Sequence, residues 1–72
     1  MDNLKERFVE ETANLQGKSV LMTVVQLPTG AKEVITNTDN LQSKVDYLKN
    51  TYDEEFKLRA NPNVRIIAYL IA

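Results

Sequence analysis

The chain has 72 residues, with nine Lys plus Arg against ten Asp plus Glu and neither cysteine nor histidine. This length predicts a single domain over residues 1–72, and the composition excludes disulfides and a Cys/His zinc site. A formal net charge of −1 lacks the basic excess of a sequence-independent nucleic-acid binder. The longest apolar run, residues 66–71, is far short of the roughly 20 residues needed to cross a bilayer, and the polar N-terminus is unlike a signal peptide. We therefore expect a soluble cytoplasmic protein with no membrane association.

The first predicted element is an amphipathic helix over residues 2–16. Asn3 and Glu6 have the spacing of a capping box, and apolar residues recur along one face. Gly17 stands where a left-handed C-terminal cap is expected, so we expect the helix to end there.

Two strands are predicted next, over residues 19–27 and 31–36, joined by a tight turn at Pro28-Thr29-Gly30. The first strand is apolar on both faces, which suits the middle of a sheet. The second is half polar, as an edge strand should be. Gly30 is expected to hold a positive φ in the turn.

A second helix is predicted to run to about Asn50, with Asp39 and Gln42 spaced as another capping box. Its apolar stripe at helical spacing is Leu41, Val45, Leu48 and Tyr52. The following segment, residues 52–63, has two alternatives: a further short helix, or an ordered loop plugged by Phe56 and Leu58.

A last strand is predicted over residues 64–71, giving the order α-β-β-α-β with or without the extra short helix. Strict alternation places Val64, Ile66, Ala68 and Leu70 in one row and the residues between them in the other. The fold class is therefore α+β: a three-stranded, mostly antiparallel sheet with the helices packed on one face. The strand order is 2-1-3, with 1-2-3 as the alternative.

No set of residues in the chain carries a catalytic pattern. Nucleophilic catalysis needs an activated Ser, Thr, Cys or Lys beside a base, and we expect no enzyme, no cofactor and no metal. The acidic run Asp53-Glu54-Glu55 offers oxygen ligands for a hard cation. A solvated turn is the stronger interpretation.

The basic residues Lys57, Arg59 and Arg65 lie near aromatic residues late in the chain. Basic groups interleaved with aromatic rings bind single-stranded nucleic acid in some proteins. Here the neighbouring carboxylates of residues 53–55 cancel the positive field, so an ordinary surface is favoured.

The last strand is the feature that a monomer explains least well, because it is apolar on both faces and has no polar gatekeeper at its end. A small chain without cysteine or histidine also has no disulfide or zinc site to stabilise it, which favours self-association as a homodimer or higher oligomer. The residues expected at the self-association surface are Arg65, Ile67, Tyr69 and Ile71. The candidate contacts for a partner or ligand are Tyr47, Tyr52, Phe56, Lys57 and Arg59.

The second half of the chain resembles a known group of proteins. It contains the runs Asn37-Thr38-Asp39-Asn40-Leu41, Lys44-Val45-Asp46-Tyr47-Leu48 and Tyr52-Asp53-Glu54, then Leu58 and Asn61 before the closing apolar strand. In this order they resemble small uncharacterised proteins encoded by phages and prophages of Gram-positive bacteria. The resemblance implies a viral, non-enzymatic protein of the host cytoplasm that acts by binding a host protein, in some cases a defence component. It carries over no functional residue.

These observations favour a small protein-interaction module that binds, and modulates or inhibits, a host or viral protein. One alternative is an accessory nucleic-acid binder that uses Lys57, Arg59 and Arg65. The other is an oligomeric binder of a small ligand or nucleotide, with its pocket formed between subunits.

Overall fold

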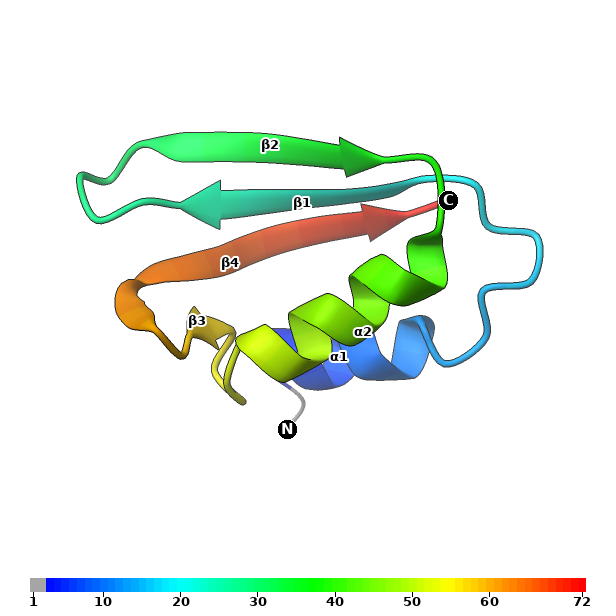
Figure 1. Ribbon diagram of the computed structural model, residues 1–72, viewed down its shortest axis with the longest axis horizontal. Coiled ribbons are helices and arrows are strands. Elements are labelled where there is room, and N and C mark those ends of the chain that lie inside the picture. Colours follow the sequence, from blue (N-terminus) through cyan, green and yellow to red (C-terminus); the bar gives the residue numbers. More distant parts are fainter. Residues whose placement is uncertain (1–2) are drawn as a thin grey trace.

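The computed structural model describes residues 3–72, so the predicted start of the first helix at residue 2 lies outside the described residues. The fold is α+β, with two helices and a four-stranded antiparallel sheet (Figure 1). In chain order the elements are α1 (Leu4–Glu11), β1 (Leu21–Gln26), β2 (Lys32–Asn37), α2 (Leu41–Thr51), β3 (Lys57–Leu58) and β4 (Asn61–Ile71).

The strand order of the sheet is β2-β1-β4-β3, and every neighbouring pair is antiparallel. This confirms the predicted order in which the apolar strand β1 lies between the other two long strands. The prediction of three strands missed β3, a two-residue strand that pairs with the start of β4. Part of the segment that had two alternatives is therefore a short strand, and no further helix forms in residues 52–63.

Helix α1 has the predicted N-cap at Asn3 but ends five residues before the predicted end at Gln16. The side chain of Asn3 accepts a hydrogen bond from the backbone N–H of Glu6 at 2.8 Å, which confirms the N-cap. The helix ends at Thr12, whose buried hydroxyl donates to the Phe8 carbonyl at 2.6 Å. Such side-chain bonds compete with helix continuation. Gly17 has the expected positive φ of 78°, but in a turn of the following loop, so its predicted role as the helix cap was wrong.

Helix α2 carries the predicted apolar stripe, with Val45 and Leu48 buried. The predicted capping box at Asp39 was wrong. The residue before the helix is Asn40, which has the left-handed values φ 51° and ψ 48° and makes no side-chain cap bond. The chain must reverse sharply between β2 and α2, and Asn is one of the few residues that tolerate this conformation.

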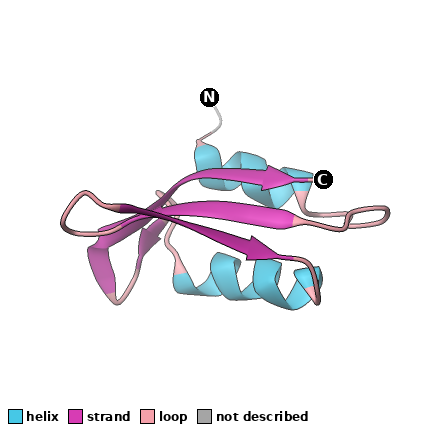
Figure 2. Ribbon diagram, turned by 90° about the horizontal axis from the view of Figure 1, so that it is seen from above, coloured by secondary structure: helices cyan, strands magenta, loops and turns pink. Residues whose placement is uncertain are grey.

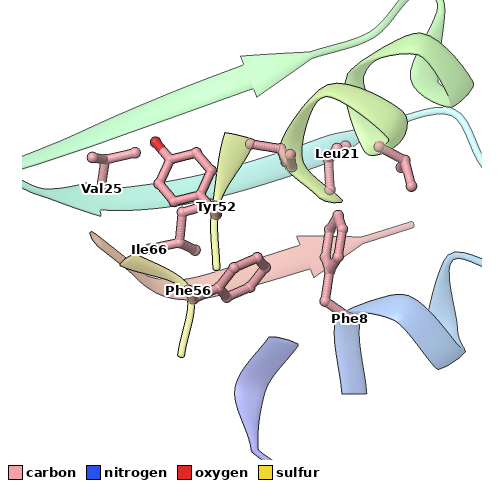
Figure 3. Close-up of a cluster of buried hydrophobic side chains, with 8 residues drawn as sticks. Phe8, Leu21, Val25, Tyr52, Phe56 and Ile66 are labelled. Carbon is pink, nitrogen blue, oxygen red and sulfur yellow. The ribbon is translucent and has the colours of Figure 1, made fainter. Parts of the chain in front are cut away.

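The two helices and the sheet enclose one core, on the face of the sheet that we call the inner face (Figures 1 and 3). Its buried hydrophobic side chains are Phe8, Leu21, Val25, Val45, Leu48, Tyr52, Phe56 and Ile66. The ring of Phe8 lies 5.3 Å from that of Phe56 and 5.2 Å from that of Tyr69, between ring centroids. Tilted and edge-on aromatic contacts of this kind add to the free energy gained by burial.

The loop between α2 and β3 is ordered and places Phe56 in the core, as the second sequence alternative expected. Phe56 has a positive φ of 62°, and the backbone N–H groups of Glu55 and Lys57 donate to the Asp53 side chain. The bond from Lys57 is the main cause that lowers the pKa of the Asp53 carboxyl. The aspartate therefore fixes the turn that aims the Phe56 ring inward.

Strand β4 contains a β-bulge, which the strict alternation did not predict. Val24 pairs with Ala68 and Val25 with Ile66, so Ile67 is the extra residue. A bulge changes the facing of the residues on either side of it. Ile66 and Tyr69 consequently both pack against the core, although alternation had placed them on opposite faces.

We expect Gly30→Ala to lower the free energy of unfolding by about 1 kcal/mol or more. Gly30 holds a φ of 90° with nothing within 4 Å of an added Cβ, so the cost comes from the backbone conformation alone. Urea denaturation measures it, with Ala31→Ser as a control beside the turn. An unchanged midpoint for Gly30→Ala would contradict the turn assignment.

We expect Thr23→Val to raise the free energy of unfolding by about 1 kcal/mol. The Thr23 side chain is fully buried, and its hydroxyl oxygen has no hydrogen-bond partner in residues 3–72. Valine replaces that hydroxyl by a methyl group of similar size. Thermal unfolding tests this, with the exposed Thr36→Val as the matched control; a less stable Thr23→Val protein would show that the hydroxyl is satisfied.

Candidate protein-interaction surface

The face of the sheet that points away from the helices is the first candidate site. Side chains along β1 alternate between buried and half-buried from Leu21 to Gln26, so successive residues face the helices and then solvent. Directly paired residues of neighbouring strands share a face. The solvent side, which we call the outer face, consists of Met22, Val24, Gln26, Lys32, Val34, Thr36, Lys57, Arg65, Ala68 and Leu70.

The outer face is apolar over its middle and over the end that lies away from the β1–β2 turn. One row across the strands is Val34, Val24 and Ala68, and the next is Thr36, Met22 and Leu70. Val34 and Leu70 are 57% and 54% exposed, which is unusual for large aliphatic side chains of a small domain. Contiguous exposed apolar surface commonly marks a place where another molecule binds.

The charged strand residues of the outer face are all basic: Lys32, Lys57 and Arg65. The row nearest the β1–β2 turn is Lys32, Gln26 and Arg65, and the Arg65 guanidinium donates to the Gln26 side chain at 3.4 Å. The strand residues of the outer face include no carboxylate, but the Glu55 carboxylate lies 3.2 Å from the Lys57 ammonium at this end. The surface is thus an apolar patch with a basic end.

The predicted self-association residues do not form one surface. Arg65 lies on the outer face and Ile67 in the bulge, whereas Tyr69 and Ile71 pack against the core. The Tyr69 hydroxyl donates to the Glu11 carboxylate of α1 at 2.5 Å.

Helix α1 lies alongside this half of β4. In Figure 2 it is the helix next to the N label, and β4 is the strand that ends at the C label. Together they line a groove of about 280 Å³. The free edge of β4 is therefore flanked by α1, so a strand that paired there would have to displace the helix.

The candidate partner contacts are also separated by the fold. Tyr52 and Phe56 are 7% and 1% exposed and belong to the core, so a partner does not reach these rings in the folded chain. Tyr47 is exposed on α2, where the Lys44 ammonium lies 4.7 Å from the centre of its ring. Tyr52 is buried because it continues the apolar stripe of α2, and Phe56 is buried because the turn at Asp53 directs its ring inward.

Lys57, Arg59 and Arg65, the basic residues of the nucleic-acid alternative, each form an ion pair or a hydrogen bond within the chain. Lys57 forms an ion pair with Glu55 at 3.2 Å, and the Arg59 side chain donates to the Asn50 carbonyl at 3.3 Å. Lys57 is also the ladder partner of Arg65. The three residues do not make a continuous basic stripe with stacking aromatic rings, which single-strand binders use.

Lys5 is a residue whose role the sequence did not indicate. Its ammonium group donates to the Lys49 and Tyr52 carbonyls, at 2.9 and 2.7 Å, and so ties α1 to the end of α2. Burial is the main cause that lowers the pKa of Lys5. Its two bonds go to carbonyls and not to a base, so Lys5 acts as a structural clamp. The contact depends on how the helices pack, which no local pattern encodes.

No group of three or more acidic side chains placed to hold a metal ion occurs in the described part of the chain. Neither described helix is long and apolar enough to span a membrane. Comparison with protein-family models, with curated protein sequences and with solved structures finds no match to this chain.

The contact between α1 and β4 should make stability fall in alkaline solution. Burial, together with the hydrogen bond to Glu11, raises the pKa of Tyr69 from 10.0 to about 12. The folded state thus keeps a proton that the unfolded state loses, so this stabilisation is complete below pH 10 and is lost as pH rises towards about 12. Thermal unfolding across this range should show a smaller fall for Tyr69→Phe than for the wild type, and Glu11→Gln should shift the tyrosine titration to lower pH. Parallel slopes for all three proteins would contradict the coupling.

Proposed function

We propose that this protein is a small non-enzymatic interaction module that binds a host or viral protein and modulates or inhibits it. The observation that carries the proposal is the outer face, where large apolar side chains stand in solvent on a sheet that is covered on one side only. Covering such a patch is favourable in proportion to the apolar area removed from water.

The partner's chemistry follows from the composition of the outer face. The apolar rows require an apolar stripe on the partner, and Lys32 with Arg65 at one end favours acidic groups at the matching end. Charge complementarity of this kind fixes orientation and rejects partners with basic ends. The resemblance to phage and prophage proteins supports a viral origin and action in the host cytoplasm.

The proposal predicts that one protein is captured through the outer face. Tagged wild-type protein, Leu70→Lys and Tyr47→Lys are each incubated with lysate of a Gram-positive bacterium, and retained proteins are quantified by mass spectrometry. Leu70 and Tyr47 have nearly equal exposed fractions, 54% and 52%, but only Leu70 lies on the outer face. We expect one stoichiometric partner to be retained by the wild type and Tyr47→Lys, and reduced at least about tenfold by Leu70→Lys.

Circular dichroism of the two variants provides the control for folding, since both side chains are exposed. Equal retention of the partner by Leu70→Lys would remove the outer face from the proposal. A wild-type protein that retains no partner would overturn the proposed function itself.

A further inference from the structure

Strand β2 has a free edge that the structure leaves open. Leu27 donates its backbone N–H to the Ala31 carbonyl at the turn, and antiparallel ladders alternate between bonded and non-bonded residue pairs. The register Val25↔Glu33 and Thr23↔Ile35 then bonds Glu33 and Ile35 to β1. The backbone N–H and C=O groups of Lys32, Val34 and Thr36 consequently point away from the sheet.

The opposite side of β1 confirms this alternation independently. Val20 and Ala72 exchange two backbone hydrogen bonds, at 2.9 and 3.0 Å. The same rule then directs the backbone groups of Met22 and Val24 towards β4. Residues of odd and even number along β1 thus bond to different neighbours, as the register at β2 requires.

No element of the described chain lies beyond β2, which is the outermost strand in Figure 1. The β1–β2 ladder has no register shift, so the edge is not twisted away by a bulge, and no proline interrupts it. Its only charges, Lys32 and Glu33, stand together at one end. Bulges, prolines and charged side chains normally protect the edges of natural sheets, and none of the three occurs along residues 34–37.

We propose that β2 pairs with β2 of a second copy of this chain, antiparallel about a twofold axis that passes beside Ile35. In several antiparallel registers the outward backbone groups of the two β2 strands can bond to each other. The charged side chains decide between these registers. An axis at Lys32 or at Glu33 sets like charges directly opposite each other, which is destabilising. An axis at Val34 sets the Glu33 carboxylate against Ile35 of the second copy.

The axis at Ile35 pairs every side chain with a suitable neighbour. Ile35 faces Ile35 in a close, non-bonded pair, and the side chain already packs against the core of its own chain. Val34 faces Thr36, and these pairs exchange the free backbone bonds. Glu33 faces Asn37, whose side-chain nitrogen is covered and has no hydrogen-bond partner within residues 3–72. Rotation of that amide towards the edge gives it a carboxylate acceptor.

The self-association expected from the sequence is thereby assigned to β2 instead of β4. The inference goes beyond the proposed function, because it concerns an edge of the sheet and leaves the outer face free. Pairing at β2 joins the outer faces of the two copies side by side into one surface. A twofold axis makes each contact away from the axis occur twice, so the backbone hydrogen bonds between Val34 and Thr36 form on both sides of it. A strand of six residues can therefore supply a complete interface.

Sedimentation equilibrium and single-cysteine cross-linking test the proposal together. The wild type is expected at dimer mass at micromolar concentrations. Val34→Pro removes one outward N–H and no bond to β1, so it should give a folded monomer. Leu70→Lys, which alters only the outer face, should stay a dimer and so separates this proposal from the proposed function.

The chain has no cysteine, so one introduced thiol reports one position. With oxidised glutathione as the oxidant, two thiols lose their protons and two electrons to form one disulfide, and the glutathione disulfide is reduced to two thiols. Ile35→Cys is expected to form a covalent dimer, because its Cα atoms lie within disulfide reach across the axis. Val34→Cys tests the register with its axis at Val34 and keeps the Glu33 charge, and Ile67→Cys tests the edge of β4.

Monomer mass for the wild type across this concentration range would overturn the proposal. So would cross-linking that is faster at Ile67→Cys or Val34→Cys than at Ile35→Cys, or an undiminished dimer in folded Val34→Pro. If Val34→Pro fails to fold, the order of cross-linking rates among the three cysteine variants still decides.

Discussion

The packing of Phe56 against Phe8 is the contact on which the rest of the structure depends. Phe8 comes from α1 and Phe56 from the loop after α2, and both rings are almost completely buried. The Phe56 carbonyl also accepts the backbone N–H of Ile66 at 2.9 Å, so one residue joins the loop to β4 and to the first helix. A positive φ at a non-glycine residue costs free energy, which the burial of the ring offsets. The turn at Asp53 thus sets where α1 can lie, and α1 in turn flanks the edge of β4.

That arrangement divides the surface of the sheet unequally. One face and one edge are closed by the two helices and by β3, whereas the outer face and the edge of β2 remain open. The bulge at Ile67 contributes, because it turns Ile66 inward while Tyr69 still contacts Phe8. Without the extra residue, one of these two side chains would be directed into solvent. These surfaces remain open because a short chain has enough residues to build a core on only one face of its sheet.

Much of the fold was predictable from local patterns. The apolar alternation of β1 identified the central strand, Gly30 marked the turn, and the stripe through Val45 and Leu48 identified the second helix. The errors arose where a side chain responds to tertiary structure. Thr12 ends α1 because its hydroxyl bonds back inside the core, and β3 exists only because Phe56 holds the chain beside β4. The sequence also does not show that α1 lies along β4, nor that the bulge separates the residues that alternation placed in one row.

The position of β1 in the middle of the sheet has a consequence for the kinetics of folding. Its pairing with β2 closes only a short turn, but its pairing with β4 brings together Leu21 and Ile71, which are 50 positions apart in the sequence. Closing a longer loop costs more entropy, and folding slows as contacts become less local. We therefore expect the hairpin to form before β4 docks, and docking of β4 to be the slower step. Until then one side of β1 is without its strand partner, and the amides of Met22 and Val24 should be among the last to gain protection from hydrogen exchange.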